Sequence, residues 1–442
     1  MRIGFIAMSG IRARAKELQE LGVTLPGFVE RKKVVASLPS LSLLTLAALT
    51  PEDVEVEYRE VQDLPPEGEL PGDYDLVAIS TFSAQSLEAY ELARRYRQAG
   101  TAVVMGGLHV TALPEEALQH CTAVAVGEGE LTWPRIVEDF RRGELAGIYR
   151  PPPGEYFDLA DAPVPRYDLL EPERYNRLTV QTTRGCPHRC SFCASSILIT
   201  PKYRCKPVAK VIEEIRAIKA VWDEPFIEFA DDNSFVNKAH GKELLRALKA
   251  ERVKWFTEAD LSIADDPELL DLMRDSGCRQ VLIGLESPVA AGLDGLETRR
   301  NWKSGQQRRY LRAIEAIQSR GITVNGCFIL GLDGHDESVF DQVHDFVDRS
   351  GLYEVQITLL TAFPGTPLLN QLRREGRILR DGACDLCTLF DVNFVPAGMS
   401  PERLQRGFVE LSRRLYDTDA IRRRRQRFFR RLRARRRRAP AA

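Results

Sequence analysis

The sequence predicts an α/β protein in which a doubly wound (Rossmann-like) domain is followed by a partial (β/α)6 barrel and a small helical C-terminal region. Three observations support this fold class. Short apolar strands alternate with helical stretches at the start of the chain, a proline-rich segment interrupts the alternation, and six further strand–helix units follow. We therefore expect domains at residues 1–150 and 176–380, a linker at 151–175 and a C-terminal region at 381–442.

In the first domain, nearly continuous apolar segments predict the strands of a parallel sheet that is covered on both faces. These segments lie at residues 3–8, 54–58, 76–80, 102–105 and 123–126. Segments with helical character separate them, at residues 41–49, 84–98, 115–120 and 133–142. Ligands of a doubly wound sheet bind beyond the carboxyl ends of the strands, so we expect a binding site there.

The prolines at 151–153 and at 163, 165 and 172 predict an extended connection, because proline removes backbone donors and restricts the chain. Beyond it, the expected strands lie at residues 178–182, 226–229, 254–257, 280–283, 323–329 and 354–358. Helices are expected at residues 208–221, 242–249, 267–276, 308–319 and 338–348. Six such units predict a partial barrel, open on one side, with its active-site loops at the carboxyl ends of the strands.

The composition, with 44% hydrophobic and 28% charged residues among 442, is that of an ordinary soluble protein. The longest nearly apolar run, residues 41–49, is shorter than the roughly 20 residues of a membrane span. The N-terminus reads as a first strand and not as a signal peptide. Nine cysteines without a secretion signal favour metal chemistry over disulfides, so we expect a cytoplasmic protein.

The net charge of −1 conceals twelve arginines between Arg422 and Arg438, a stretch that contains no acidic residue. The rest of the chain is acidic, so stable nucleic-acid binding is not expected. The simplest interpretation of this end is a solvated helix that frays, and peripheral contact with an anionic membrane is the next. The pair Cys384 and Cys387 has no partner pair and is interpreted as structural or free thiols.

Three cysteines, Cys186, Cys190 and Cys193, follow the first barrel strand with CxxxCxxC spacing. A 4Fe–4S cluster takes four thiolates, so three leave one iron free to bind and activate a small molecule. The alternative is a zinc site with His188 as the fourth ligand. Four ligands within eight residues would be strained for structural zinc, so the cluster is favoured.

With Phe192 before its last cysteine, this motif resembles that of the radical S-adenosylmethionine superfamily, and the ends of later strands match it as well. The resemblance implies that Asp231 or Asp232 holds the methionine amino group, and that Glu286 and Ser287 contact the methionine and ribose. It places Gly331 near the adenine. Helix capping by the aspartates and a buried structural role for Glu286 are the competing interpretations.

Glycine pairs at the expected strand ends of the first domain resemble the cobalamin-binding domain of cobalamin-dependent radical enzymes. The implied cofactor-binding residues are Ser80, Thr81, Gly106, Gly107, His109, Thr111, Gly127, Glu128 and Gly129. No DxHxxG motif occurs, so no histidine from such a motif is expected to ligate cobalt. His109 is more simply a hydrogen-bonding residue than a ligand, and a sheet that has lost its cofactor is the alternative for the whole domain.

The resemblance implies cleavage of S-adenosylmethionine and cobalamin-dependent methylation of an unactivated carbon in a small-molecule or peptide substrate. A cyclase or rearrangement enzyme without net methylation is the nearest alternative. A methylthiotransferase would need a second cluster on three N-terminal cysteines, whereas that region contains only Cys121. A non-enzymatic cobalamin or redox sensor would not need an open iron. The expected partner is a low-potential electron donor such as flavodoxin or ferredoxin, and no catalytic side chain is singled out.

Overall fold

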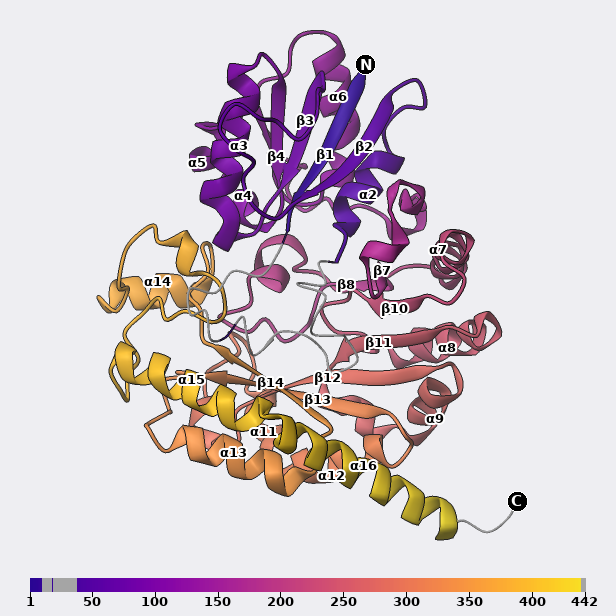
Figure 1. Cartoon of the computed structure of the whole chain (residues 1–442), viewed down its shortest axis with the longest axis vertical. Coiled ribbons are helices and arrows are strands. Elements are labelled where there is room, and N and C mark those ends of the chain that lie inside the picture. Colours follow the sequence, from indigo (N-terminus) through magenta and orange to yellow (C-terminus); the bar gives the residue numbers. More distant parts are fainter. Residues whose placement is uncertain (10–17, 19–37, 439–442) are drawn as a thin grey trace.

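The computed structural model describes residues 1–9, 18 and 38–438, and the side chains of this range up to residue 435. An N-terminal domain sits above a larger domain, and C-terminal helices run along the outside of the latter (Figure 1). The α/β architecture expected from the sequence is confirmed, with one parallel sheet in each domain. The loop after the first strand, where a DxHxxG motif would lie, falls largely outside the described residues.

The first sheet has six parallel strands in the order β2-β1-β3-β4-β5-β6. Their bounds are Arg2–Met8, Glu55–Val61, Leu76–Ser80, Ala102–Gly106, Ala123–Ala125 and Gly147–Tyr149 for β1 to β6. Five of them were expected, and β6 was missed because it is only three residues long. Each face has its own core: Ile6 of β1 belongs to one cluster and Phe5 to the other. This alternation confirms a sheet covered on both sides.

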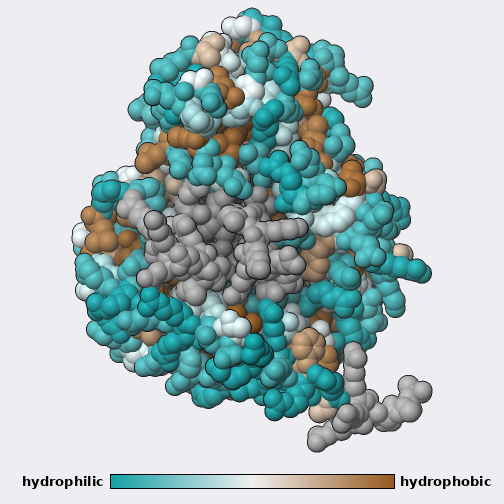
Figure 2. Space-filling model, in the orientation of Figure 1, coloured by the Kyte–Doolittle hydropathy of each residue, from teal (hydrophilic) through white to brown (hydrophobic). Residues whose placement is uncertain are grey.

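The helices of this domain cover both faces of the sheet (Figure 1). Their bounds are α2 Leu41–Ala48, α3 Ser86–Gln98, α4 Leu108–Ala112, α5 Pro114–Leu118 and α6 Trp133–Arg141. Helix α4 starts directly after β4, so the carboxyl end of that strand passes at once into a helix N-terminus. Figure 2 shows hydrophobic surface on this domain close to its junction with the rest of the molecule.

The second sheet is also parallel, in the order β14-β13-β12-β11-β10-β7, and its two outer strands do not pair with each other. The strands are β7 Leu178–Val180, β10 Phe226–Phe229, β11 Lys254–Ala259, β12 Cys278–Glu286, β13 Thr323–Leu330 and β14 Glu354–Leu359. The helices between them are α7 Val208–Val221, α8 Lys238–Glu251, α9 Pro267–Asp275, α10 Ala290–Leu293, α11 Trp302–Gln306, α12 Tyr310–Gln318 and α13 Val339–Ser350. This arrangement is the open six-stranded barrel that the sequence predicts.

The proline-rich connection makes hydrogen bonds to both domains. Tyr167 is buried and donates a hydrogen bond of 2.8 Å to the backbone oxygen of Thr179 at the start of the barrel. The Tyr175 hydroxyl donates to Glu60 of β2 at 2.8 Å. Because these contacts reach both domains, the connection is an ordered part of the junction.

The C-terminal region comprises α14 Pro367–Arg374, a short 3-10 turn at Cys384–Leu386, α15 Pro401–Tyr416 and α16 Thr418–Arg438. The arginine-rich end is a helix, as expected, but part of it packs against the barrel instead of being solvated on all sides. Phe428 is buried against Tyr353, and Arg427 donates to the backbone oxygen of Asp348 near the end of α13. An arginine on the last carbonyls of a helix also complements its dipole, so α16 is held by packing and by charge.

No helix in the described part of the chain is long and apolar enough to span a bilayer.

Candidate active site between the two sheets

A cavity of about 700 Å³ lies where the carboxyl ends of the two sheets face each other. From the N-terminal domain it is lined by Ser80, Thr81, Gly106, Gly107, Gly127, Glu128 and Gly129. From the barrel it is lined by Arg177, Thr179, Gln181, Arg184 and Asp232. The structure therefore brings together eight residues that the sequence singled out on two separate domains.

Gly107 shows why this edge of the first sheet uses glycine. Its φ is +99°, and a Cβ there would lie 3.1 Å from both the Ser80 hydroxyl oxygen and the Thr81 backbone oxygen. A side chain at this position would be strained and crowded. The glycines leave backbone exposed to the cavity, which suits a large flat ligand such as a corrin.

His109, by contrast, does not line the cavity. It is fully buried, with its Nε2 atom 2.9 Å from the Tyr90 hydroxyl and its Nδ1 atom 3.2 Å from the Ser83 hydroxyl. Burial lowers its pKa. The simpler interpretation fits this geometry: His109 is a hydrogen-bonded core residue. Thr111 lies nearby and accepts the Gly127 N–H at 3.0 Å, so it holds the glycine loop in place.

The three cysteines lie in a loop whose base is a two-residue antiparallel ladder between β8 (Thr183–Arg184) and β9 (Arg204–Cys205). Gly185 has φ +94°, and a Cβ there would lie 2.5 Å from the Lys202 backbone oxygen. The turn into Cys186 therefore requires glycine. A single turn of π-helix at Ser195–Ile199 follows the last cysteine.

The thiols of this loop suit an iron–sulfur cluster. Burial raises the pKa of Cys186 to about 11 and also raises the pKa values of Cys190 and Cys193. Neighbouring thiols further raise those of Cys186 and Cys190, and Asp232 further raises that of Cys193. Thiolates in this setting need the positive charge of a metal centre, and three of them from one loop match a cluster with one open iron. Among the described residues, no three His, Cys, Asp or Glu side chains are placed to hold a single metal ion.

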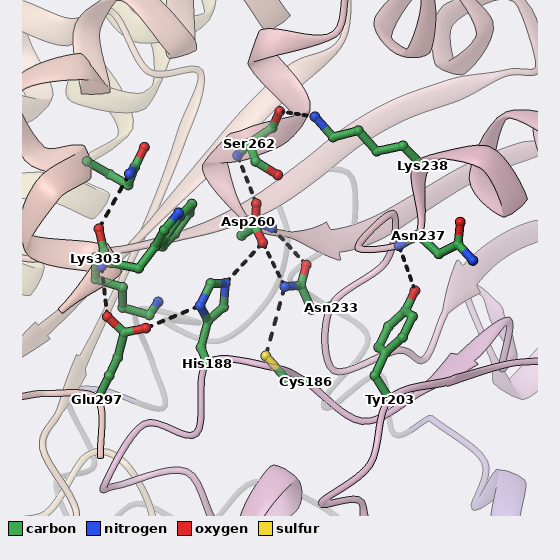
Figure 3. Close-up of polar contacts among 12 residues, drawn as sticks. Cys186, His188, Tyr203, Asn233, Asn237, Lys238, Asp260, Ser262, Glu297 and Lys303 are labelled. Atoms are coloured by element: carbon green, nitrogen blue, oxygen red, sulfur yellow. Dashed lines mark hydrogen bonds and ion pairs between the residues drawn. The ribbon is translucent and has the colours of Figure 1, made fainter. Parts of the chain in front are cut away.

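His188 is also unsuited to be a zinc ligand. Its Nε2 atom lies 3.0 Å from an Asp260 oxygen and its Nδ1 atom 3.2 Å from a Glu297 oxygen (Figure 3). Its ring packs against Trp302 in a tilted arrangement, with the ring centres 4.5 Å apart. Both ring nitrogens are therefore engaged, and the zinc alternative is not formed here.

Asn233 connects this network to the cysteines. Its amide donates to Asp260 at 2.9 Å and lies 3.9 Å from the Cys186 sulfur (Figure 3). Burial alone would raise the pKa of Asp260, but hydrogen bonds from His188, Asn233 and Ser262 hold it below its usual range. Asp260 thus stays charged and anchors the cysteine loop. Asp260 immediately follows β11 and was not predicted from the sequence.

The two adjacent aspartates have different surroundings. Asp231 is buried and accepts hydrogen bonds from the N–H groups of Thr182 and Thr183 at 2.7 and 2.9 Å, and from two hydroxyls. Asp232 accepts the Gly185 N–H at 3.0 Å and lines the cavity. The hydroxyls of Ser195 and Thr200 also donate to Asp232. Asp231 therefore shapes the chain before the cysteines, and Asp232 is the aspartate of the pair that lines the cavity.

Glu286 ends β12 with a left-handed φ of +60° and pairs with Lys303, whose Nζ lies 2.5 Å from the carboxylate. Both side chains are nearly buried, and the Lys303 ammonium also lowers the pKa values of all three cysteines. The sequence analysis missed Lys303, because nothing in its local sequence distinguishes it from a surface lysine. A strand-end carboxylate with φ in this region marks a functionally constrained position.

Ser287 and Gly331 make contacts inside the protein. The Ser287 hydroxyl lies 2.8 Å from the His335 Nε2 atom. A Cβ on Gly331 would lie 2.7 Å from a Leu404 methyl group, so this glycine permits α15 to pack on the barrel. Neither residue lines the cavity.

Carboxylates outnumber cations in the barrel interior. Burial, together with the charges of Glu228, Asp232, Asp231 and Glu286, raises the pKa of Glu258 to about 8. Arg177 pairs with Glu228 and Lys303 with Glu286, so that among the described ion pairs none joins Glu258, Asp231 or Asp232 to a basic side chain. A cationic ligand would relieve this repulsion, and a sulfonium compound with an ammonium group fits that requirement.

Comparison with known proteins agrees with this geometry. Residues 180–347 match the model of the Radical SAM superfamily, residues 32–137 match that of the B12 binding domain, and residues 366–442 match a domain of unknown function, DUF4070. An uncharacterized methyltransferase of Synechocystis is 31% identical, over 86% of this chain and 71% of that protein. The bacteriochlorophyllide d C-12(1)-methyltransferase of Chlorobaculum tepidum is 28% identical, over 88% of this chain and 85% of that protein.

A solved structure shows the same fold. It is that of the radical S-adenosylmethionine methyltransferase TsrM from Kitasatospora setae with cobalamin and a 4Fe–4S cluster bound. The TM-score is 0.67 at 16% identity, and the match covers 95% of this chain and 89% of TsrM.

Proposed function

Because the chain belongs to the family of cobalamin-dependent radical S-adenosylmethionine enzymes, we propose that it methylates an unactivated carbon of a small, largely apolar substrate. One observation carries this proposal: the cavity at the glycine-lined edge of the first sheet is also lined by Arg184 and Ser195, which flank the cysteine loop, and by Asp232, which accepts the Gly185 N–H. The three cysteines lie behind this lining and are not part of it. When bound, the cluster supplies the electron that cleaves S-adenosylmethionine to a carbon radical, and the cobalamin carries the methyl group.

The residues divide between the two cofactors. Cys186, Cys190 and Cys193 would hold the cluster, with the Asn233 amide beside the first of them. Asp232 would pair with the ammonium of the methionine moiety, and Lys303 would attract its carboxylate. The cobalamin would rest on the backbone at the strand ends, contacted by Ser80, Thr81, Gly106, Gly107, Gly127 and Gly129. Asp231, Thr111 and Ser287 would act through the loops that they hold.

The cavity lining supports a lipophilic substrate. Leu38, Leu41, Leu46, Phe82 and Trp133 all contribute to it, and apolar lining exceeds polar lining. An apolar site of this size orients a rigid hydrophobic ring system through shape and a few polar contacts. The bacteriochlorophyllide methyltransferase among the relatives acts on a ring system of this kind. A cyclase or rearrangement enzyme without net methylation is less supported, because the relatives described above are methyltransferases.

The test is anaerobic reconstitution with iron, sulfide and hydroxocobalamin, followed by turnover with S-adenosylmethionine that carries a labelled methyl group. We expect four irons and one cobalamin per chain, and formation of both 5′-deoxyadenosine and S-adenosylhomocysteine with label in the product. A panel of tetrapyrroles and polycyclic isoprenoids identifies the substrate. Cys193→Ala should take up cobalamin but form no 5′-deoxyadenosine. Iron uptake without cobalamin uptake would refute the two-cofactor function, and 5′-deoxyadenosine without labelled product would support the cyclase.

Two partner interactions belong to the same proposal. The cluster would be reduced by a small acidic flavodoxin or ferredoxin.

The outward side of α16, which exposes Arg422, Arg423, Arg430 and Arg433, would meet anionic lipid, because those charges point away from the barrel. Sedimentation with phosphatidylglycerol vesicles, compared with phosphatidylcholine vesicles, tests the second interaction. Replacing these four arginines with glutamine should abolish the difference.

A further inference from the structure

We infer that Glu128, Glu130, Arg184 and Arg204 form a clamp that sets the position of the cysteine loop relative to the cobalamin-binding edge of the first sheet. The inference rests on the proposed two-cofactor function and adds a part to it. The glutamates belong to the N-terminal domain and the arginines to the barrel domain. We call these four residues the interdomain clamp.

Charge-assisted hydrogen bonds join the two sides of the clamp. The Arg184 guanidinium donates to Glu128 and Glu130 at 2.8 and 2.7 Å through its two terminal nitrogens. Its Nε atom donates to Gln181 at 2.9 Å. Arg204 also donates to Glu128. Each glutamate is thus held by at least one arginine from the other domain. All three guanidinium nitrogens of Arg184 donate hydrogen bonds within the protein.

The place of the two arginines in the chain gives the clamp its function. Arg184 and Arg204 are paired residues of the β8–β9 ladder, which closes the base of the loop that contains the three cysteines. Arg184 is separated from Cys186 by Gly185 alone. On the other side, Glu128 and Glu130 alternate with Gly127 and Gly129, which line the cavity. A shift of one domain would therefore move the base of the cysteine loop directly.

The clamp also holds the connection between the domains. Glu128 accepts the Phe157 N–H at 2.8 Å, and Arg204 donates to the Phe157 backbone oxygen at 2.7 Å. Arg204 lies over the Tyr156 ring, 5.0 Å from its centre. Residues from both domains and the linker therefore meet at one small group of charges.

Burial makes this group selective for one arrangement. The four side chains are between 4% and 14% exposed, and the charges of two glutamates and two arginines balance. Buried ion pairs gain little net stability against apolar residues but penalise every arrangement that leaves a charge unpaired. Glu128 was expected from the sequence to contact the cofactor. Both of its oxygens are engaged by the clamp and Phe157, so its role is to position the loop.

Hydrogen exchange of the full-length enzyme, reconstituted with cluster and cobalamin, tests the clamp. Arg184→Met should speed exchange about tenfold, or about 1.4 kcal/mol, in three segments: 127–131, 155–158 and 183–186. Glu130→Gln should act in the same direction but less, and should add nothing in the Arg184→Met background, because Arg184 is its partner in the clamp. Glu115→Gln is the matched control, since it removes a carboxylate whose exposed partner, Arg150, lies in the same domain.

A second measurement reports the relation between the cofactors themselves. The magnetic interaction between cob(II)alamin and the reduced cluster broadens their EPR signals according to distance. Arg184→Met should give a broader distribution of this interaction while iron content stays at four per chain, and Glu115→Gln should match the wild type.

Three results would overturn the inference. Faster exchange confined to residues 183–186 would mean that Arg184 serves the cysteine loop alone. Additive effects of Glu130→Gln and Arg184→Met would mean that the two side chains do not act together. An unchanged EPR interaction would mean that the clamp does not set the cofactor geometry. If Arg184→Met does not fold, Glu130→Gln decides the exchange test. Failure of the wild type to bind cobalamin would refute the proposed function, whereas exchange in the cluster-loaded protein still decides whether the clamp exists.

Discussion

Replacing Lys303 with methionine tests whether the buried cation at the end of β12 is an essential part of the site. The Lys303 and Glu286 side chains are 11% and 9% exposed, and the lysine is the hydrogen-bond partner of the carboxylate. Methionine keeps the length of the side chain but leaves Glu286 charged and unpaired. Breaking a buried pair from one side costs about 3–5 kcal/mol, so we expect a loss of that size in the free energy of unfolding.

The assay is urea unfolding of the cluster-free protein at pH 7.5, followed by fluorescence and by circular dichroism to detect any intermediate. Glu286→Gln and the double variant Glu286→Gln/Lys303→Met complete the cycle. Because the double variant has no unpaired charge, it should recover about 2 kcal/mol relative to Lys303→Met alone. Arg246→Met is the control, since the side chains of its ion pair with Glu268 are 57% and 56% exposed. It should leave the midpoint close to that of the wild type.

Additive single losses would refute the reasoning, because they would show that Glu286 and Lys303 do not depend on each other. A loss below about 1 kcal/mol for Lys303→Met would also refute it, since an exposed pair behaves in that way. Binding of S-adenosylmethionine provides a separate readout. In the absence of urea, where the variant is still folded, cluster-loaded Lys303→Met should bind S-adenosylmethionine at least tenfold more weakly, because the carboxylate of its methionine moiety loses its cation.

Three further predictions follow from the same structure. Asp231→Asn should lower the free energy of unfolding in urea by about 3 kcal/mol, because the amide cannot accept all four hydrogen bonds of the buried carboxylate. Asp232 accepts three hydrogen bonds at the cavity wall, so Asp232→Asn should cost less stability but lose S-adenosylmethionine cleavage; equal stability of the two variants would contradict the assignment. Gly107→Ala should lower the free energy of unfolding by about 1–3 kcal/mol and weaken cobalamin uptake. Gly143→Ala, at a residue with φ +73° in open space, should leave cobalamin uptake unchanged. Equal uptake by the two variants would exclude a close approach of cobalamin to the backbone at Gly107. Burial lowers the pKa of His335 to about 4, below the roughly 6.5 of an unfolded histidine. At pH values between these two, the unfolded state binds more protons than the folded state, so the free energy of unfolding falls as the pH falls through this window. Between pH 7.5 and 5 the wild type should therefore lose about 2 kcal/mol more than His335→Asn, and parallel pH profiles would exclude this role.

The fold could be predicted because its signals are local. Each parallel strand buried on both faces is a short apolar run, and each crossover helix follows it within a few residues, as in Leu76–Ser80 and Ser86–Gln98. The three-residue strand Gly147–Tyr149 was missed because so short a run does not differ from a loop. The packing of the arginine-rich helix was missed because Phe428 is buried beside Tyr353, a contact that sequence spacing does not reveal.

The candidate site could be predicted only as far as strand ends define it. The glycine pairs mark loops that do line the cavity, whereas the cysteine loop reaches it only through Arg184 and Ser195 on either side of the cysteines. Which of two neighbouring aspartates faces inward depends on how the turn after β10 closes. Asp231 turns back to the chain at Thr182 and Asp232 reaches Gly185, and both partners lie more than forty residues away. The direction of a side chain at such a turn is a tertiary property.

The four residues from Gly127 to Glu130 show why a motif can mark a site and still misassign its side chains. Glycine and glutamate alternate there, and the family resemblance implied a cofactor contact for Gly127, Glu128 and Gly129. The glycines suit that role because they expose backbone to the cavity. The glutamates face guanidinium groups that come from a different domain, 54 to 76 residues further along the chain. Only the folded arrangement of the two domains shows that this short stretch both lines the cavity and contacts the base of the cysteine loop. The Glu128 carboxylate already binds two arginines, so it is not available to bind a corrin as well.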